Sequence, residues 1–74
     1  MNYFYIYTDL SPKFLAALFE ANDIFAKADL GMGVYIVEAP YTYPANIQKL
    51  VWGMKPGAYC EVKDAEYDDI EENL

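Results

Sequence analysis

The chain has 74 residues, of which 55% are hydrophobic, and it combines a mean hydropathy of -0.04 with a formal net charge of -7. Its length supports one hydrophobic core and its apolar share is enough to fill that core, so two domains and intrinsic disorder are excluded. The sequence contains five lysines but no arginine and no histidine, and we therefore expect no direct binding to DNA or RNA, which depends on cationic contacts to phosphates.

Residues 2–8 alternate aromatic and branched side chains and contain no strong helix former, which predicts a first strand. The period of two separates the side chains into two faces. Tyr3, Tyr5 and Tyr7 share one face, and Phe4, Ile6 and Thr8 share the other.

Ser11 and Pro12 are typical of a helix start, with serine as the N-cap and proline at the first helical position. The apolar stripe that follows consists of Phe14, Leu15, Leu18 and Phe19. The end of this helix has two interpretations, a stop at Asn22-Asp23 or a continuation to Asp29.

If the helix stops at Asn22, residues 24–30 form a second strand, and Gly31-Met32-Gly33 is a hairpin loop into a third strand at residues 34–39. If the helix continues, Gly31 is its C-cap and only three strands remain, in the order β-α-β-α-β. We favour the hairpin.

Pro44 predicts the start of a second helix with an apolar stripe, and Pro56-Gly57 predicts its end. The stripe contains Ile47, Leu50, Val51 and Met54. Residues 58–63 then alternate again and predict the last strand.

The predicted order β-α-β-β-α-β resembles the ferredoxin-like split βαβ fold, an α+β architecture with an antiparallel sheet and both helices on one face. The resemblance is one of element order over residues 2–63, so it implies a fold and no activity. We expect one domain at residues 1–63 and an acidic C-terminal tail at residues 64–74.

In this arrangement one sheet face lies under the helices and the other is open. The helix side is expected to hold Phe4, Ile6, Ile24, Val34, Ile36, Ala58, Cys60 and Val62. The open side is expected to hold Tyr3, Tyr5, Tyr7, Phe25, Tyr35, Val37 and Tyr59, with Lys27, Glu61 and Lys63 among them. A patch of this size needs a cover, which the tail, a second copy of the chain or a different protein could supply.

Almost all the surplus charge lies in the tail. Residues 1–63 hold six acids and five lysines, whereas residues 64–74 hold six acids and no base. The first interpretation is a solvated, frayed terminus. The second is a docking element, because Tyr67, Ile70 and Leu74 would line one side of a short helix. The candidate partner-binding residues are Tyr3, Tyr5, Tyr7, Tyr35, Tyr59, Asp64, Glu66, Tyr67, Asp68, Asp69, Glu71 and Glu72.

Catalysis is not expected, since nucleophilic mechanisms usually rely on a histidine base. Ser11 is explained as a helix cap, and Cys60 as a buried thiol. We expect no cofactor and no metal site. The first residues lack a signal-peptide pattern, no stretch is long enough to cross a membrane, and the single cysteine forms no internal disulfide. These features favour a cytoplasmic protein.

Two functional hypotheses follow. The first is a small protein-binding module that occludes a basic, nucleic-acid-binding protein. In size and acidity the chain is similar to the DNA-mimicking inhibitors of phages and mobile elements, including anti-restriction, anti-CRISPR and uracil-DNA-glycosylase inhibitor proteins. The alternative is a structural or regulatory module that forms a homodimer through its tyrosine-rich sheet face.

Overall fold

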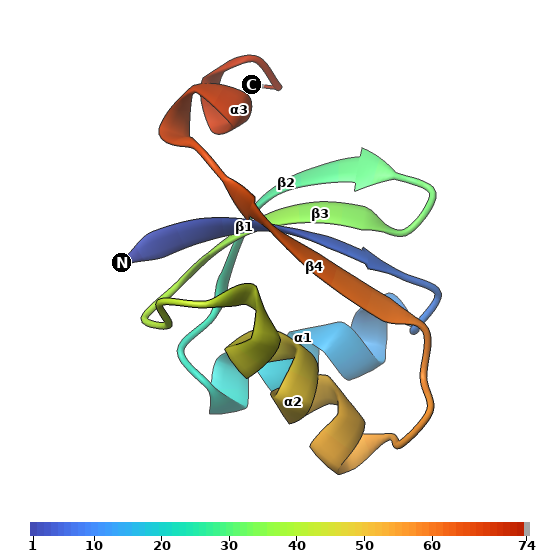
Figure 1. Cartoon of the computed structure of the whole chain (residues 1–74). Helices are drawn as coiled ribbons and strands as arrows, with labels where there is room; N and C mark the ends of the chain where they lie inside the picture. The colour runs from blue at the N-terminus through green and yellow to red at the C-terminus, as the bar shows by residue number, and fades with distance from the viewer. Residues whose placement is uncertain (74) are drawn as a thin grey trace.

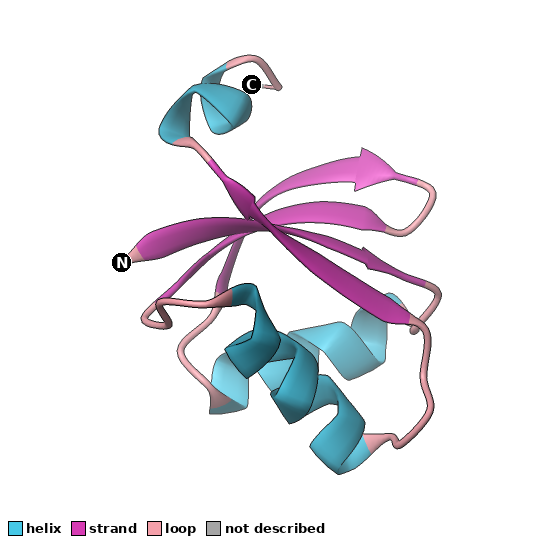
Figure 2. Ribbon diagram, viewed as in Figure 1, coloured by secondary structure: helices cyan, strands magenta, loops and turns pink. Residues whose placement is uncertain are grey.

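The computed structural model describes residues 1–73, and within them the chain forms a four-stranded antiparallel sheet and three helices. The elements are β1 (Asn2–Thr8), α1 (Pro12–Ala21), β2 (Phe25–Gly31), β3 (Val34–Ala39), α2 (Pro44–Met54), β4 (Cys60–Ala65) and α3 (Tyr67–Glu71). The strand order is β2-β3-β1-β4. Helices α1 and α2 cover one face of the sheet, and α3 lies on the opposite side (Figures 1 and 2).

Helix α1 begins at the predicted Ser11-Pro12 and ends at the earlier of the two predicted positions. The Ser11 hydroxyl accepts a hydrogen bond from the Phe14 N–H at 3.2 Å, and Pro12 occupies the first helical position. At the other end the Asn22 side chain donates to the Leu18 carbonyl, and Asp23 takes a left-handed φ of 57°. The chain therefore leaves the helix at Asn22, which confirms the four-stranded alternative.

The hairpin between β2 and β3 has a two-residue loop, Met32-Gly33, instead of the predicted three-residue loop. Gly31 pairs with Val34, and both loop residues have positive φ, 55° and 80°. This is the type I′ geometry that matches the twist of the flanking strands. Met32 is fully exposed at the tip.

The pairing of β1 with β3 reverses one prediction. Phe4 lies opposite Val37 and Ile6 lies opposite Tyr35, so Tyr35 and Val37 face the helices, while Val34 and Ile36 face the other side. The predicted faces of β3 are wrong because Val34-Tyr35-Ile36-Val37 is apolar at every position and has no period of two. A one-residue change of phase moves every side chain to the other face.

The faces predicted for β2 and β4 agree with the observed strand pairing. Cys60 and Val62 lie opposite Thr8 and Ile6 on the helix side, and both are buried. The last strand runs two residues later than predicted, so Ala58 precedes it and packs half-buried against the core. Ile24 precedes β2 and is buried on the helix side. Phe25 lies opposite Glu38, which places it on the open side as expected.

The main core fills the space between the sheet and helices α1 and α2. Its side chains are mostly aliphatic and include Phe4, Ile6, Leu15, Leu18, Val37, Ile47 and Val51. Two polar side chains of α2 tie the helix to the start of β4: Gln48 donates to the Cys60 carbonyl at 2.7 Å, and Trp52 donates to the Ala58 carbonyl at 2.9 Å. Trp52 lies off the apolar stripe and is 44% exposed. Across the described residues, no helix has the length and apolar character needed to cross a membrane.

Candidate protein-binding surface

In residues 1–73, two buried apolar side chains lie outside the helix-side core. Within the described chain, Ile36 and Ile70 are the buried apolar residues that lie outside the helix-side core, at 0% and 6% exposure. Ile36 lies on β3 opposite Tyr5, and Ile70 comes from α3. Because α3 lies on this side of the sheet (Figure 1), the C-terminal helix is docked on the face that the tyrosines occupy. Burial of this kind does not fit a frayed terminus.

Helix α3 is short, and polar contacts help to define it. The Asp69 carboxylate accepts a hydrogen bond from the Glu66 N–H at 2.7 Å, which closes the first turn. The Asn73 side chain donates to the Asp69 carbonyl at 2.7 Å. An isolated helix of five residues would not be stable in water, so the burial of Ile70 is what retains it.

Tyrosines of β1 connect the helix to the sheet. The rings of Tyr3 and Tyr67 lie 5.9 Å apart between centroids, with a tilt of 58°, a favourable geometry for aromatic pairs. Tyr67 remains 55% exposed, so it sits beside Tyr3 at the edge of the contact and is not inserted into it. Of the predicted apolar stripe, Ile70 is thus the buried member, and Leu74 lies outside the described residues.

Carboxylates surround the hydroxyl groups of these tyrosines. Desolvation by burial raises the pKa of Tyr3 above its ordinary value, and the nearby Glu38 carboxylate raises it further. Desolvation likewise raises the pKa of Tyr5, and there the nearby Asp69 carboxylate adds to the effect. Both phenols are therefore neutral at pH 7, and each has a carboxylate close by.

The lysines of this face are already engaged by other groups. Lys27 forms an ion pair with Glu38 at 3.5 Å, and Lys63 forms one with Glu61 at 3.4 Å. The Lys63 ammonium also lies 5.4 Å from the centre of the Tyr7 ring. Over residues 1–73, the carboxylates of α3 form no ion pair with a lysine. This side of the protein is accordingly rich in uncompensated negative charge.

A hollow of about 410 Å³ lies where β1, β4 and α3 meet. Its lining residues include Tyr3, Tyr67, Asp64 and Glu66. Two aromatic rings and two carboxylates around one hollow form a chemically suitable setting for a cationic side chain. Asp64 lies opposite Phe4 and therefore points to the helix side, so it borders the hollow only at the end of the sheet. We call the surface made by Tyr3, Tyr5, Glu38 and residues 66–72 the acidic tyrosine patch.

The structure does not bring all the predicted binding residues together. Tyr3, Tyr5, Tyr67 and five of the six tail carboxylates belong to the acidic tyrosine patch. The sixth, Asp64, lies opposite Phe4 and points to the helix side. Tyr7 lies farther along β1, stacked beside Tyr5 at 6.2 Å. Tyr35 is on the helix side, and Tyr59 lies just before β4, at the end opposite α3.

Sequence reasoning missed Glu38 as a member of this surface. It is the single charged residue within the apolar run of β3, and a charged side chain in a strand usually faces solvent. That signal would have placed Val34, Ile36 and Glu38 on the open side and so predicted the correct phase of the strand.

Metal ligation and the thiol of Cys60 are the remaining chemical features of the described residues. In residues 1–73 no group of three or more carboxylate or cysteine side chains is arranged to hold a metal ion. Cys60 is 4% exposed, and burial raises the pKa of its thiol, which keeps it in the unreactive neutral form at pH 7. The comparisons of this chain with protein-family models, with curated proteins and with solved structures give no match.

Proposed function

We propose that this protein is a non-catalytic binding module whose acidic tyrosine patch docks on the basic surface of a nucleic-acid-binding protein. The observation that carries the proposal is the burial of Ile70 at 6% exposure, because it holds the acidic segment on the sheet as part of a defined surface. Carboxylates held in fixed positions lose less conformational entropy on binding than those of a flexible tail.

The chemistry of the patch supports a basic protein partner. Its surplus negative charge would accelerate encounters with a cationic surface. Tyr3 and Tyr67 add aromatic contact area, and the hollow beside Asp64 and Glu66 has the character to receive a lysine or arginine side chain. A partner that binds nucleic acid presents such side chains, so occupying them would exclude the nucleic acid. An inhibitor of the DNA-mimic type, carried by a phage or mobile element, is the specific form of this proposal.

The proposal also covers the fold family and the subcellular location of the protein. We infer a ferredoxin-like split βαβ fold for residues 1–65, supported by the order β2-β3-β1-β4 and by two helices on one sheet face. We also infer a cytoplasmic protein, since the buried free thiol of Cys60 suits a reducing compartment.

The experiment is an affinity capture from the native host with three matched baits. The first is the full chain, and the second ends at Ala65 and keeps β4 intact. The third keeps Ile70 and Tyr67 but carries Asp68→Asn, Asp69→Asn, Glu71→Gln and Glu72→Gln. We expect the full chain alone to retain a specific protein, and excess DNA or RNA to displace it.

Equal capture by all three baits would exclude the acidic tyrosine patch as the binding element. Capture of a protein that has no affinity for nucleic acid would contradict the inhibitor form of the proposal. The bait with neutral side chains separates the contribution of charge from that of the docked helix.

A further inference from the structure

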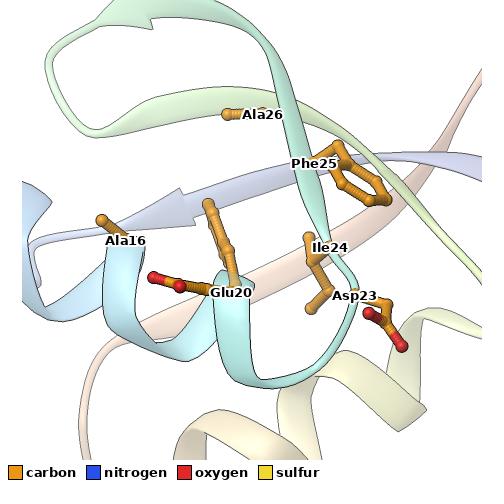
Figure 3. Close-up of a pocket in the computed structure, with 7 residues that line it drawn as sticks. Ala16, Glu20, Asp23, Ile24, Phe25 and Ala26 are labelled. Carbon is orange, nitrogen blue, oxygen red and sulfur yellow. The ribbon is translucent and has the colours of Figure 1, made fainter.

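A second surface lies on the other side of the sheet, where α1 meets the edge strand β2. A groove of about 380 Å³ opens between them, and its floor and walls include Ala16, Phe19, Ile24 and Ala26 (Figure 3). It is mostly apolar, and its volume is near the lower end of ligand-binding pockets, roughly 300–1,000 Å³. We call it the edge groove.

The edge groove leaves a core-facing position uncovered. Ala26 lies opposite the fully buried Val37 and therefore points to the helix side of the sheet. Ala26 is nevertheless exposed, and so is Ala16 on the facing helix. The sheet and the helix thus diverge at this edge, and an apolar side chain from outside would fill the space between them.

Strand β2 also has an open backbone edge. It is the outermost strand on its side of the sheet and pairs with β3 alone, so backbone N–H and C=O groups along it face solvent. The ladder is irregular between Ala26 and Ala28 and again between Asp29 and Gly31. Bulges of this kind protect an edge from extended pairing, which leaves the regular start of β2, beside the groove, as the accessible segment.

Charge at the rim indicates the chemistry of the occupant. Glu20 on α1 and Asp23 in the following turn line the groove, and both are exposed. Among residues 1–73 neither forms an ion pair with a lysine. An apolar floor with two carboxylates beside it is complementary to an apolar side chain flanked by basic residues.

We propose that the edge groove binds an extended peptide segment of a partner protein, which adds to the start of β2 and inserts an apolar side chain between α1 and β2, with a lysine or arginine near Glu20 and Asp23. This is peptide recognition by strand addition, in which the backbone supplies hydrogen bonds and the groove supplies side-chain selectivity. The site is separate from the acidic tyrosine patch and does not depend on the function proposed for it.

The test uses a capped synthetic peptide, Lys-Thr-Leu-Thr-Lys, titrated into the full-length ¹⁵N-labelled protein. In an extended peptide the leucine and both lysines point to the same side. We expect saturable shifts of the amide signals of residues 16–26. A peptide with serine in place of leucine should bind at least tenfold more weakly, and so should one methylated on alternate backbone nitrogens.

Matched protein variants locate the site. Ala16→Trp should fill the groove and weaken binding at least tenfold, whereas Ala17→Trp, on an exposed neighbour outside the groove, should leave it unchanged. Glu20→Gln with Asp23→Asn should weaken binding and reduce its dependence on salt. The same charge change made with Glu71→Gln and Glu72→Gln should have no effect on these shifts.

Several results would overturn the proposal. One is the absence of any amide shift with the leucine peptide, and another is a set of shifts centred on α3. Equal weakening of binding by Ala16→Trp and Ala17→Trp would also overturn it, as would an unchanged affinity of the methylated peptide. Binding of a small apolar compound such as indole in the groove, without binding of the peptide, would assign the groove to a different class of ligand and also refute the proposal.

Discussion

At the scale of single residues, the tightest constraint on this fold is the approach of the hairpin loop to the end of β1. The Thr8 N–H donates to the Gly33 carbonyl at 2.9 Å, and a Cβ on Gly33 would collide with the Thr8 carbonyl oxygen. Gly31 has almost the same φ, 82° against 80°, but open space around it. Substitutions at the two glycines can therefore distinguish the cost of backbone strain from the cost of a steric collision.

We predict that Gly31→Ala costs only the left-handed backbone strain, about 1–2 kcal/mol of unfolding free energy. Gly33→Ala should cost about 1–3 kcal/mol more, because the collision adds an overpacking penalty. Urea denaturation of both variants and the parent protein measures the difference. Equal losses would mean that Gly33 is required for its φ alone and that the contact with Thr8 relaxes freely.

The phenols of Tyr3 and Tyr5 predict a dependence of stability on pH. Folding raises both pKa values above the ordinary 10.0, so the neutral form is favoured in the folded state. The stability that they contribute is complete below pH 10 and is lost as the pH rises through the folded-state values. Absorbance at alkaline pH should show late ionisation of these two phenols relative to unfolded protein. In Tyr5→Phe one late phenol should disappear, and an unchanged titration would contradict the assignment.

At the scale of elements, the parts predicted correctly are those with strong local signals. Strand β1 has a clear period of two, and Ser11-Pro12 and Pro44 mark helix starts that the structure retains. The faces of β3 were predicted wrongly, because pairing with β1 decides them and the local pattern does not. For the candidate surface, the sequence indicated the acidic tail, but the position of α3 beside Tyr3 depends on contacts distant in sequence.

The docking of α3 depends on one buried side chain, and this gives a prediction about local stability. Ile70→Ala should lower the free energy of opening of α3 by about 2 kcal/mol or more, the usual cost of emptying a buried aliphatic site. Amide hydrogen exchange should accelerate in residues 67–72 while β1 and β3 keep their protection. Glu71→Ala, at an exposed position of the same helix, is the control and should leave exchange slow. Acceleration by both variants alike would show that Ile70 does not anchor the helix.

At the scale of the whole molecule, α3 determines how much of the tyrosine-bearing sheet face is open to another copy of the chain. With α3 in place, Ile36 is fully buried and Tyr3, Tyr5 and Tyr7 are half-buried. Residues 66–74 also carry five of the acids that make up the net charge of -7. Loss of this segment removes the buried Ile70 from this face and a source of repulsion together, and exposed apolar surface favours association.

We therefore predict that the full chain sediments as a monomer and that the variant ending at Ala65 associates in a concentration-dependent way. The variant that neutralises Asp68, Asp69, Glu71 and Glu72 separates the two causes, because it keeps Ile70 and Tyr67. If this variant stays monomeric, the docked helix itself prevents association. If it associates like the truncated chain, charge repulsion is what keeps the full chain monomeric. A full chain that is already a dimer, and that Tyr5→Glu converts to a monomer, would contradict this prediction and support self-association through the sheet face, since a carboxylate beside Ile36 is incompatible with an apolar dimer contact.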